Sequence, residues 1–300
     1  MRKSLLACVL ALVVVAVPAS PAAAEDLVLN WPQLLPGLTE GYEPSSENDC
    51  KAGRIQCVDS VIREMGRRFE PLAESCDHDA MFALLYLRVT ETYREQVGAP
   101  GDFFTDEGFV NHEDAVFARY YFDAQDAYDK GRATPEAWQI AFDAARDRKV
   151  SGLGNLLLGV NAHVNRDLPY VLSAIGMVGP DGSSRKPDHD EVNEILFDAY
   201  GPAIDEAAAR FDPSVGTQYP HPVFATLGYN SGMAAIQGWR ESAWRYAERM
   251  AAASSDAARA QVAAEVEAYA AGQAQLIRGA TAYGLLSSSA SRDAHCAAHG

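Results

Sequence analysis

Apolar residues recur every three or four positions along most of the chain, which is the spacing of one face of an α-helix. The pattern is clear at Val58, Val61, Ile62, Met65 and Phe69. No useful stretch alternates apolar and polar residues, as a strand with one exposed face would. The pattern therefore predicts an all-α protein. Helices are expected to begin near these residues: Cys57, Asp77, Thr105, Pro135, Ser151, Asp188, Gly232 and Ala257.

We expect residues 25–300 to form a single multi-helix bundle around one buried central helix. A chain of this length is near the upper limit for one hydrophobic core. Residues 25–48 contain Pro32, Pro36 and Pro44 and are expected to be an irregular lead-in. Residues 287–300 are expected to be a loose tail unless Cys296 anchors them.

The segment Ser151–Pro169 is the expected centre of the bundle. From Ser151 to Asn165 it contains no charged side chain, in a chain that is otherwise rich in carboxylates. On a helix most of its leucines and valines cover one broad face, while Asn161 and Asn165 lie on the opposite side with Leu158. Because both sides are low in charge, the pattern is typical of a helix that is buried on most of its circumference.

His163 and Asp167 lie one turn apart on the apolar face of that helix. Such a pair can bind one metal ion, or it can act as a catalytic histidine with an orienting carboxylate. The structural alternative is a buried histidine bonded to Asp167, with Asp167 capping a following helix that has Pro169 in its first turn. Taken alone, the pair favours this alternative, because every buried polar group needs a partner.

A second polar cluster follows at the start of the helix expected near Asp188. It contains His189, Asp190 and Asn193. Its structural alternative places His189 on the surface and uses Asp188 and Glu191 for capping. We predict instead that the helix ending at Asp167 packs against this one and closes a metal site. The predicted ligands of a divalent ion, with zinc as the expected metal, are His163, Asp167, His189 and Asp190, and the further polar site residues are Asn161, Asn165 and Asn193.

The first residues of the chain, Met1–Ala24, have the pattern of a secretory signal peptide. A basic start precedes the apolar run Leu5–Val17, and an A-x-A site predicts cleavage after Ala24. We therefore expect a secreted protein with no membrane-spanning segment. Removing the leader, whose only charges are Arg2 and Lys3, changes the formal net charge from −16 to −18. An acidic chain of this kind is not expected to bind nucleic acid through a basic surface.

Four cysteines remain after the leader, and an even number in an exported protein predicts two disulfides. The sequence leaves three pairings open. We expect Cys50 to pair with Cys57, which closes a short loop, and Cys76 to pair with Cys296, which ties the tail to an early helix.

The block NLLLGVNAHVNRDLP, which spans residues 155–169, resembles the signature of an uncharacterised, mostly actinobacterial family, domain of unknown function 5995. The likeness rests on Asn161, His163, Asn165 and Asp167, followed by Leu168-Pro169. Weaker matches are Pro135 with Trp138 and the run Asp190-Glu191-Val192-Asn193, so the likeness covers about residues 103–211. The resemblance implies an all-α fold with a shared polar site, and it implies no activity.

Three functional hypotheses follow. The first is a metal-dependent hydrolase, phosphoesterase-like, with His163 and Asp167 as catalytic residues and a small-molecule or lipid-like substrate. Secreted all-α zinc phospholipases and nucleases are similar in kind, but this chain lacks a Trp at the expected mature amino terminus. The alternative is a non-catalytic extracellular binding protein with a polar pocket in the bundle. The third is a haem or oxygen-activating protein with His163 as ligand. No nucleotide-binding or serine-nucleophile motif is present.

Overall fold

Helices make up most of the part that the structure, a computed structural model, describes: residues 41–99, 101, 103–217, 222–284 and 287–300. Only two isolated β-bridges, Val150 with Ala282 and Val178 with Ser184, occur there, so the predicted all-α bundle is confirmed. The predicted signal peptide and most of the lead-in lie outside the described residues. No helix in the described part combines the length and the apolar character needed to cross a membrane.

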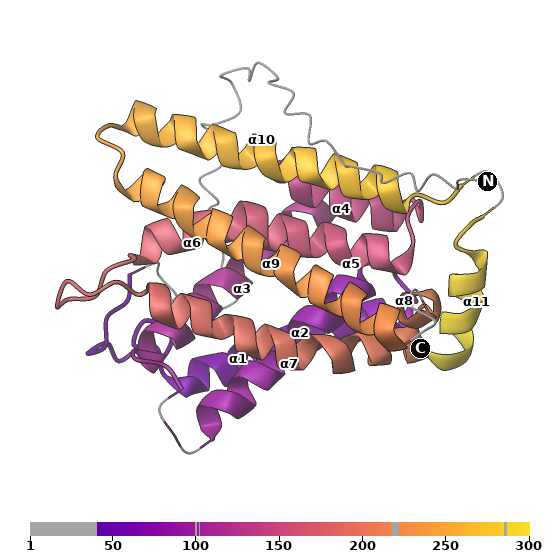
Figure 1. The fold of residues 1–300 in the computed structure, drawn as a ribbon, viewed down its shortest axis with the longest axis horizontal. Coiled ribbons are helices and arrows are strands. Elements are labelled where there is room, and N and C mark those ends of the chain that lie inside the picture. The colour runs from indigo at the N-terminus through magenta and orange to yellow at the C-terminus, as the bar shows by residue number, and fades with distance from the viewer. Residues whose placement is uncertain (1–40, 100, 102, 218–221, 285–286) are drawn as a thin grey trace, which may run out of the picture.

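The helices follow one another with short connections, and Figure 1 shows α10 along one edge, α9 crossing the bundle diagonally and α7 on the opposite side. Their bounds are α1 (Ile55–Glu74), α2 (Ala80–Gly98), α3 (Glu107–Asp129), α4 (Glu136–Arg146), α5 (Gly152–Asn161), η2 (Ala162–Asp167), α6 (Leu168–Ile175), α7 (Lys186–Arg210), α8 (Ser214–Thr217), α9 (Pro222–Ala251), α10 (Asp256–Thr281) and α11 (Ala290–His299).

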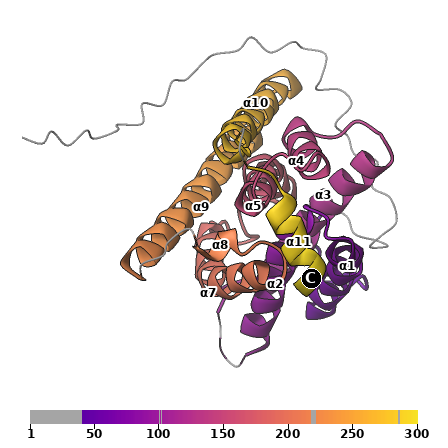
Figure 2. The same ribbon diagram turned by 90° about the vertical axis from the view of Figure 1, so that its right-hand side faces the viewer.

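The predicted central helix is present, and it is longer than expected. Helices α5, η2 and α6 form one continuous rod through the bundle. In the end view of Figure 2, α5 lies among α2, α4, α8 and α10, all of which contact it. Nearly every residue from Asn155 to Pro169 is buried. The rod is therefore buried on all sides, because helices surround it.

Asp167 directly precedes α6 and Pro169 lies in the first turn of α6, as the structural alternative expected, but the Asp167 side chain does not cap this helix. Its backbone is helical, its side chain makes no capping bond, and α6 continues directly from it. The segment before it, η2, is a π-helix, in which each turn is wider than in an α-helix. Pro169 offers a physical reason, because its ring would clash with the carbonyl of Asn165 in a regular α-helix and a wider turn relieves that clash.

The glycines of the central helix allow neighbouring helices to approach closely, as the sequence suggested. A Cβ atom at Gly159 would overlap the ring of Phe82 on α2, and one at Gly154 would overlap Thr281 at the end of α10. Glycine at these two positions is thus required by packing rather than by backbone conformation.

Three other helix starts differ from the prediction. Helix α9 begins at Pro222, well before the expected start near Gly232. Helix α7 begins at Lys186, so Asp188 lies inside its first turn, and its carboxylate accepts hydrogen bonds from the backbone N–H groups of Thr105 (2.7 Å) and Asp106 (2.9 Å). The run Thr134-Pro135-Glu136 predicts a cap at Thr134 with Pro135 at the first helical position, but Pro135 occupies the N-cap position of α4. A long-range acceptor role for Asp188 competes with local capping, and the sequence pattern does not reveal it.

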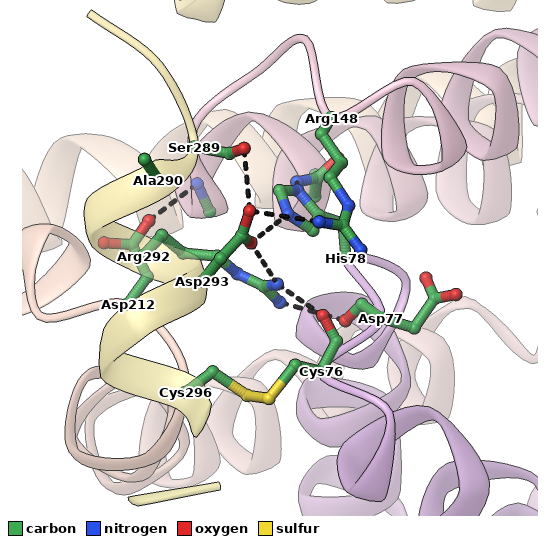
Figure 3. A network of polar contacts seen from close by, with 12 residues as sticks. Cys76, Asp77, His78, Arg148, Asp212, Ser289, Ala290, Arg292, Asp293 and Cys296 are labelled. Carbon is green, nitrogen blue, oxygen red and sulfur yellow. Dashed lines mark hydrogen bonds and ion pairs between the residues drawn. A yellow bond between two sulfur atoms is a disulfide. The ribbon is translucent and has the colours of Figure 1, made fainter. Parts of the chain in front are cut away.

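Both expected disulfides are present, Cys50–Cys57 and Cys76–Cys296. The second bond anchors the tail, which forms α11 instead of remaining loose. Figure 3 shows how polar contacts add to this anchor. Arg292 donates to the carbonyl oxygens of Cys76 and Asp77.

The α11 anchor also uses a buried histidine that had no obvious partner in the sequence. Nε2 of His78 lies 2.9 Å from Oδ1 of Asp293, and Nδ1 of His78 accepts from the Asn155 amide at 3.2 Å. Asn155 belongs to α5, so these contacts link the carboxyl-terminal helix to the central rod.

Candidate functional site

A cavity of about 120 Å³ lies beside the central rod. Its walls come from α2, α3, α5 with η2, α7 and α9, and they are largely aliphatic and aromatic. The residues that line it are Phe82, Leu85, Tyr86, Val89, Thr90, Tyr93, Val110, Glu113, Asp114, Phe117, Val160, His163, Val164, Val192, Ile195, Leu196, Tyr200, Met233, Ile236 and Arg240. A mainly apolar cavity with a few polar groups is the usual form of a small-molecule site.

His163 is the polar residue that the central rod contributes to this cavity. Its ring stacks on Phe117, with centroids 3.5 Å apart and planes 7° from parallel. Its Nδ1 lies 3.1 Å from Oδ2 of Asp167. Its Nε2 is enclosed and has no hydrogen-bond partner in the described protein. Because Asp167 does not line the cavity, we infer that the ring edge facing the cavity carries Nε2.

The protonation state of His163 follows from its surroundings. Burial lowers its pKa below the usual value, and the attraction of Asp167 opposes this only in part. The imidazole is therefore neutral at pH 7. A carboxylate only accepts hydrogen bonds, so Nδ1 carries the proton and Nε2 presents a lone pair.

Asp167 is fully buried and is held by donors from three residues. Trp138 Nε1 donates to its Oδ2 at 2.9 Å, and Arg166 donates to its Oδ1 at 3.0 Å. Arg166 in turn contacts Glu267 of α10 at 2.9 Å. These contacts fix the carboxylate, which fixes the orientation of His163. The weak sequence match of Pro135 with Trp138 thus falls on a residue that bonds to this pair.

Two further unsatisfied groups of the cavity come from α2 and α3. The hydroxyl of Tyr86 and Oδ2 of Asp114 are enclosed and have no hydrogen-bond partner in the described protein. Burial, together with the neighbouring charge of Glu113, raises the pKa of Asp114 to about 7. Burial also raises the pKa of Tyr86 well above its usual range. Tyr86 is therefore a neutral hydroxyl, and Asp114 changes charge close to neutral pH.

The predicted amide pair has a structural role. Nδ2 of Asn161 donates to the backbone oxygen of Ala270 on α10 at 3.0 Å, and Nδ2 of Asn165 donates to Oδ1 of Asn161 at 2.9 Å. Neither residue lines the cavity. These amides therefore join the central rod to α10. Asn193 is half-buried on α7, and its Oδ1 has no described partner.

His189 is buried rather than exposed, so its surface placement in the structural alternative is wrong. Arg240 of α9 donates to its main-chain oxygen and lies 3.3 Å from its Nδ1. Oε1 of Glu113 is 3.9 Å from the same ring nitrogen. His189 packs on Trp244 and does not line the cavity that contains His163.

The structure brings together only part of the predicted metal site. His163 and Asp167 are in contact, whereas Asp190 is exposed and pairs with Lys186 at 2.5 Å. Helix α7 packs mainly on α2 instead of on η2. In the described ranges, no three or more His, Cys, Asp or Glu side chains are grouped so that they could hold a metal ion. The four predicted ligands therefore do not fit one shared zinc ion, whose ligands must lie about 2 Å from it.

Among the polar groups of the cavity, sequence reasoning missed Tyr86 and Arg240. The position of Arg240 in the sequence does indicate that it is unusual. It continues the apolar stripe of α9 through Met233, Ile236 and Trp244, where a charged residue is out of place.

A family model described as "Family of unknown function (DUF5995)" matches residues 58–280. The match includes all of the cavity lining. No curated protein and no solved structure matches the chain.

Proposed function

The chain belongs to the DUF5995 family of unknown function, and we propose that its cavity binds a small, largely apolar molecule that donates a hydrogen bond to Nε2 of His163. One observation carries this proposal: Nε2 is a buried acceptor without a partner, in the wall of a cavity. An unsatisfied buried acceptor costs about 1–3 kcal/mol, so a ligand that supplies the missing donor gains that energy.

The size of the cavity limits the ligand. Its volume, about 120 Å³, is somewhat less than the roughly 150 Å³ of an apolar protein cavity that holds one benzene molecule, so a single ring is the upper limit for the buried part of the ligand. The aromatic rings of Phe82, Tyr86 and Phe117 line it. A single ring or a short branched chain that bears a hydroxyl or an N–H group matches both size and chemistry.

Phenol and toluene provide the test, because they differ mainly in a hydroxyl against a methyl group. Binding is measured by calorimetry to the wild type and to His163→Phe, which keeps a ring and removes both nitrogens. We expect the affinity ratio of phenol to toluene to fall about tenfold in the variant. His299→Gln, at an exposed histidine, is the matched control and should leave the ratio unchanged. An equal ratio in wild type and His163→Phe contradicts the proposal.

A second candidate is hydrolysis with His163 as general base. It is favoured by the contact of Nδ1 with Asp167, which orients a neutral imidazole as catalytic bases are oriented. In this reaction Nε2 takes a proton from water while the water oxygen attacks the carbonyl carbon of a carboxylic ester or the phosphorus of a phosphate ester. The bond from that atom to the leaving oxygen breaks, and the imidazolium returns its proton to this oxygen, so that the alcohol leaves. Phenyl acetate and phenyl phosphate are the probes. Turnover that His163→Phe leaves intact rejects this role.

The zinc-dependent form of that hydrolase is tested separately. The protein is purified without chelator, and its zinc content and phenyl phosphatase activity are measured before and after dialysis against a chelator. Stoichiometric zinc whose removal abolishes activity supports the metal enzyme, and activity without zinc supports the metal-free base.

We also infer that the protein is exported. The sequence of Met1–Ala24 and the two disulfides support this, because disulfides persist in oxidising compartments. Sequencing the amino terminus of protein from the culture medium tests it, and Glu25 is the expected first residue.

A further inference from the structure

Arg240 is an unusual arginine, buried in the wall of an apolar cavity. It is 5% exposed and lines the same cavity as His163. Its terminal nitrogen donates to the main-chain oxygen of His189, which fixes the guanidinium against α7. Its Nε is enclosed and has no hydrogen-bond partner in the described protein. A donor on a cation is therefore left unused where water is scarce.

The other buried arginines show what this one lacks. Each of them, among the described residues, lies within ion-pair distance of a carboxylate: Arg119 of Asp123 at 2.9 Å, Arg166 of Asp167 at 3.0 Å, Arg292 of Asp293 at 3.3 Å and Arg185 of Asp106 at 3.6 Å. Arg240 forms no ion pair with any carboxylate of the described chain. An isolated buried charge is costly and is normally paired. Among the buried arginines of the described chain, the one that lacks a carboxylate partner is therefore the one that lines the cavity.

The nearby acidic residues do not supply that partner. Burial lowers the pKa of Arg240 to about 10. The negative charges of Glu113 and Asp190 act in the opposite direction and raise this pKa, but they offset the effect of burial only in part. Oε1 of Glu113 lies 3.9 Å from Nδ1 of His189 instead of against the guanidinium. Asp190 pairs with Lys186 at the surface. The guanidinium remains without a direct counter-ion.

We propose that Arg240 is the anchor for a carboxylate on the ligand, so that the cavity takes a small organic acid with an apolar body. This inference rests on the proposed function and specifies its ligand class. An oxygen of the carboxylate accepts the Nε–H of Arg240, and the apolar body lies among the rings near His163. Hydrogen bonds to charged groups are about twice as strong as neutral ones, so the acid group supplies a large part of the affinity.

The test compares 4-hydroxybenzoate with 4-hydroxybenzyl alcohol by calorimetry at pH 7.5. Both have one ring and a phenolic hydroxyl for His163, and they differ in the carboxylate. We expect wild type to bind the acid roughly ten- to a hundredfold more tightly than the alcohol. Arg240→Gln should remove this preference. Arg245→Gln is the matched control on α9, because Arg245 is exposed and pairs with Glu241 and Glu248.

The possible outcomes separate this inference from the proposed function. Equal binding of acid and alcohol, or an acid preference that survives in Arg240→Gln, overturns the anchor and leaves the proposed function standing. Binding of neither compound overturns both. If Arg240→Gln does not fold, Arg240→Lys keeps the charge but lacks Nε–H, and it should lose most of the preference. The wild-type comparison stands in either case.

Discussion

The imidazole of His163 stacks face to face on the ring of Phe117, with the two centroids 3.5 Å apart. This contact joins η2 to α3, and the hydrogen bond to Asp167 holds the same imidazole at its edge. The ring is therefore fixed in two directions, while Nε2 has no partner. A group oriented this firmly in a cavity wall is suited to recognise a ligand.

Replacing Phe117 with leucine removes the stack but keeps an apolar side chain. We expect the free energy of unfolding to fall by about 1–2 kcal/mol, since an aromatic pair adds to the loss of packing. Phe197→Leu is the control, because Phe197 is 44% exposed on α7. Urea denaturation measures both variants, and equal losses in the two contradict a specific role for the stack.

Asp167→Asn tests the group that orients the histidine. The substitution removes the Asp167 carboxylate as an ion-pair partner of Arg166. It also removes the negative charge that raises the pKa of His163. Breaking one partner of a buried ion pair costs about 3–5 kcal/mol, so a large loss of stability is expected. The pKa of His163, measured by NMR titration, should fall further below its usual value. A rise in that pKa contradicts the assigned contact.

Asp114 gives the cavity a pH dependence of defined sign. Its folded pKa, about 7, is raised above the unfolded value, so the folded state holds a proton that the unfolded state releases. Its contribution to stability is present at low pH and is lost as pH rises from about 4 to about 7.

Asp114→Asn removes this titration while keeping the shape of the side chain. The difference in unfolding free energy, wild type minus variant, should decrease from pH 4 to pH 7 and stay constant above it. Chemical denaturation at a series of pH values measures it. A difference that increases with pH shows that Asp114 is stabilised as the anion.

Two glycines provide a matched test of the close packing around the central rod. Gly159→Ala places a Cβ against the ring of Phe82, whereas Gly272→Ala on α10 points into open space. We expect Gly159→Ala to destabilise by at least about 1–3 kcal/mol through overpacking. Gly272→Ala should stabilise by up to about 1 kcal/mol, the helix propensity difference. Thermal unfolding that shifts both variants in the same direction contradicts this packing.

Local pattern predicted the helices and the buried character of the segment that holds His163 and Asp167. It could not predict the cavity, because the cavity joins Tyr86, His163 and Arg240, which come from three distant parts of the chain. The predicted cap at Asp188 was wrong for the same reason: its partners, Thr105 and Asp106, belong to a remote loop. Long-range contacts of this kind leave no periodic signal along the sequence.

The predicted zinc cluster also depended on long-range contacts that the sequence pattern does not reveal. The sequence placed His163 and His189 on apolar helix faces, and both are buried. Which neighbour each would meet depended on tertiary packing. His189 meets Arg240, and His163 meets Phe117.

A crystal structure of the protein with phenol bound tests directly whether His163 recognises a ligand. The proposed function predicts the phenol ring in the cavity beside Phe117, with its oxygen about 2.6–3.2 Å from Nε2 of His163. Phenol bound elsewhere, or bound in the cavity with its hydroxyl turned away from Nε2, contradicts it.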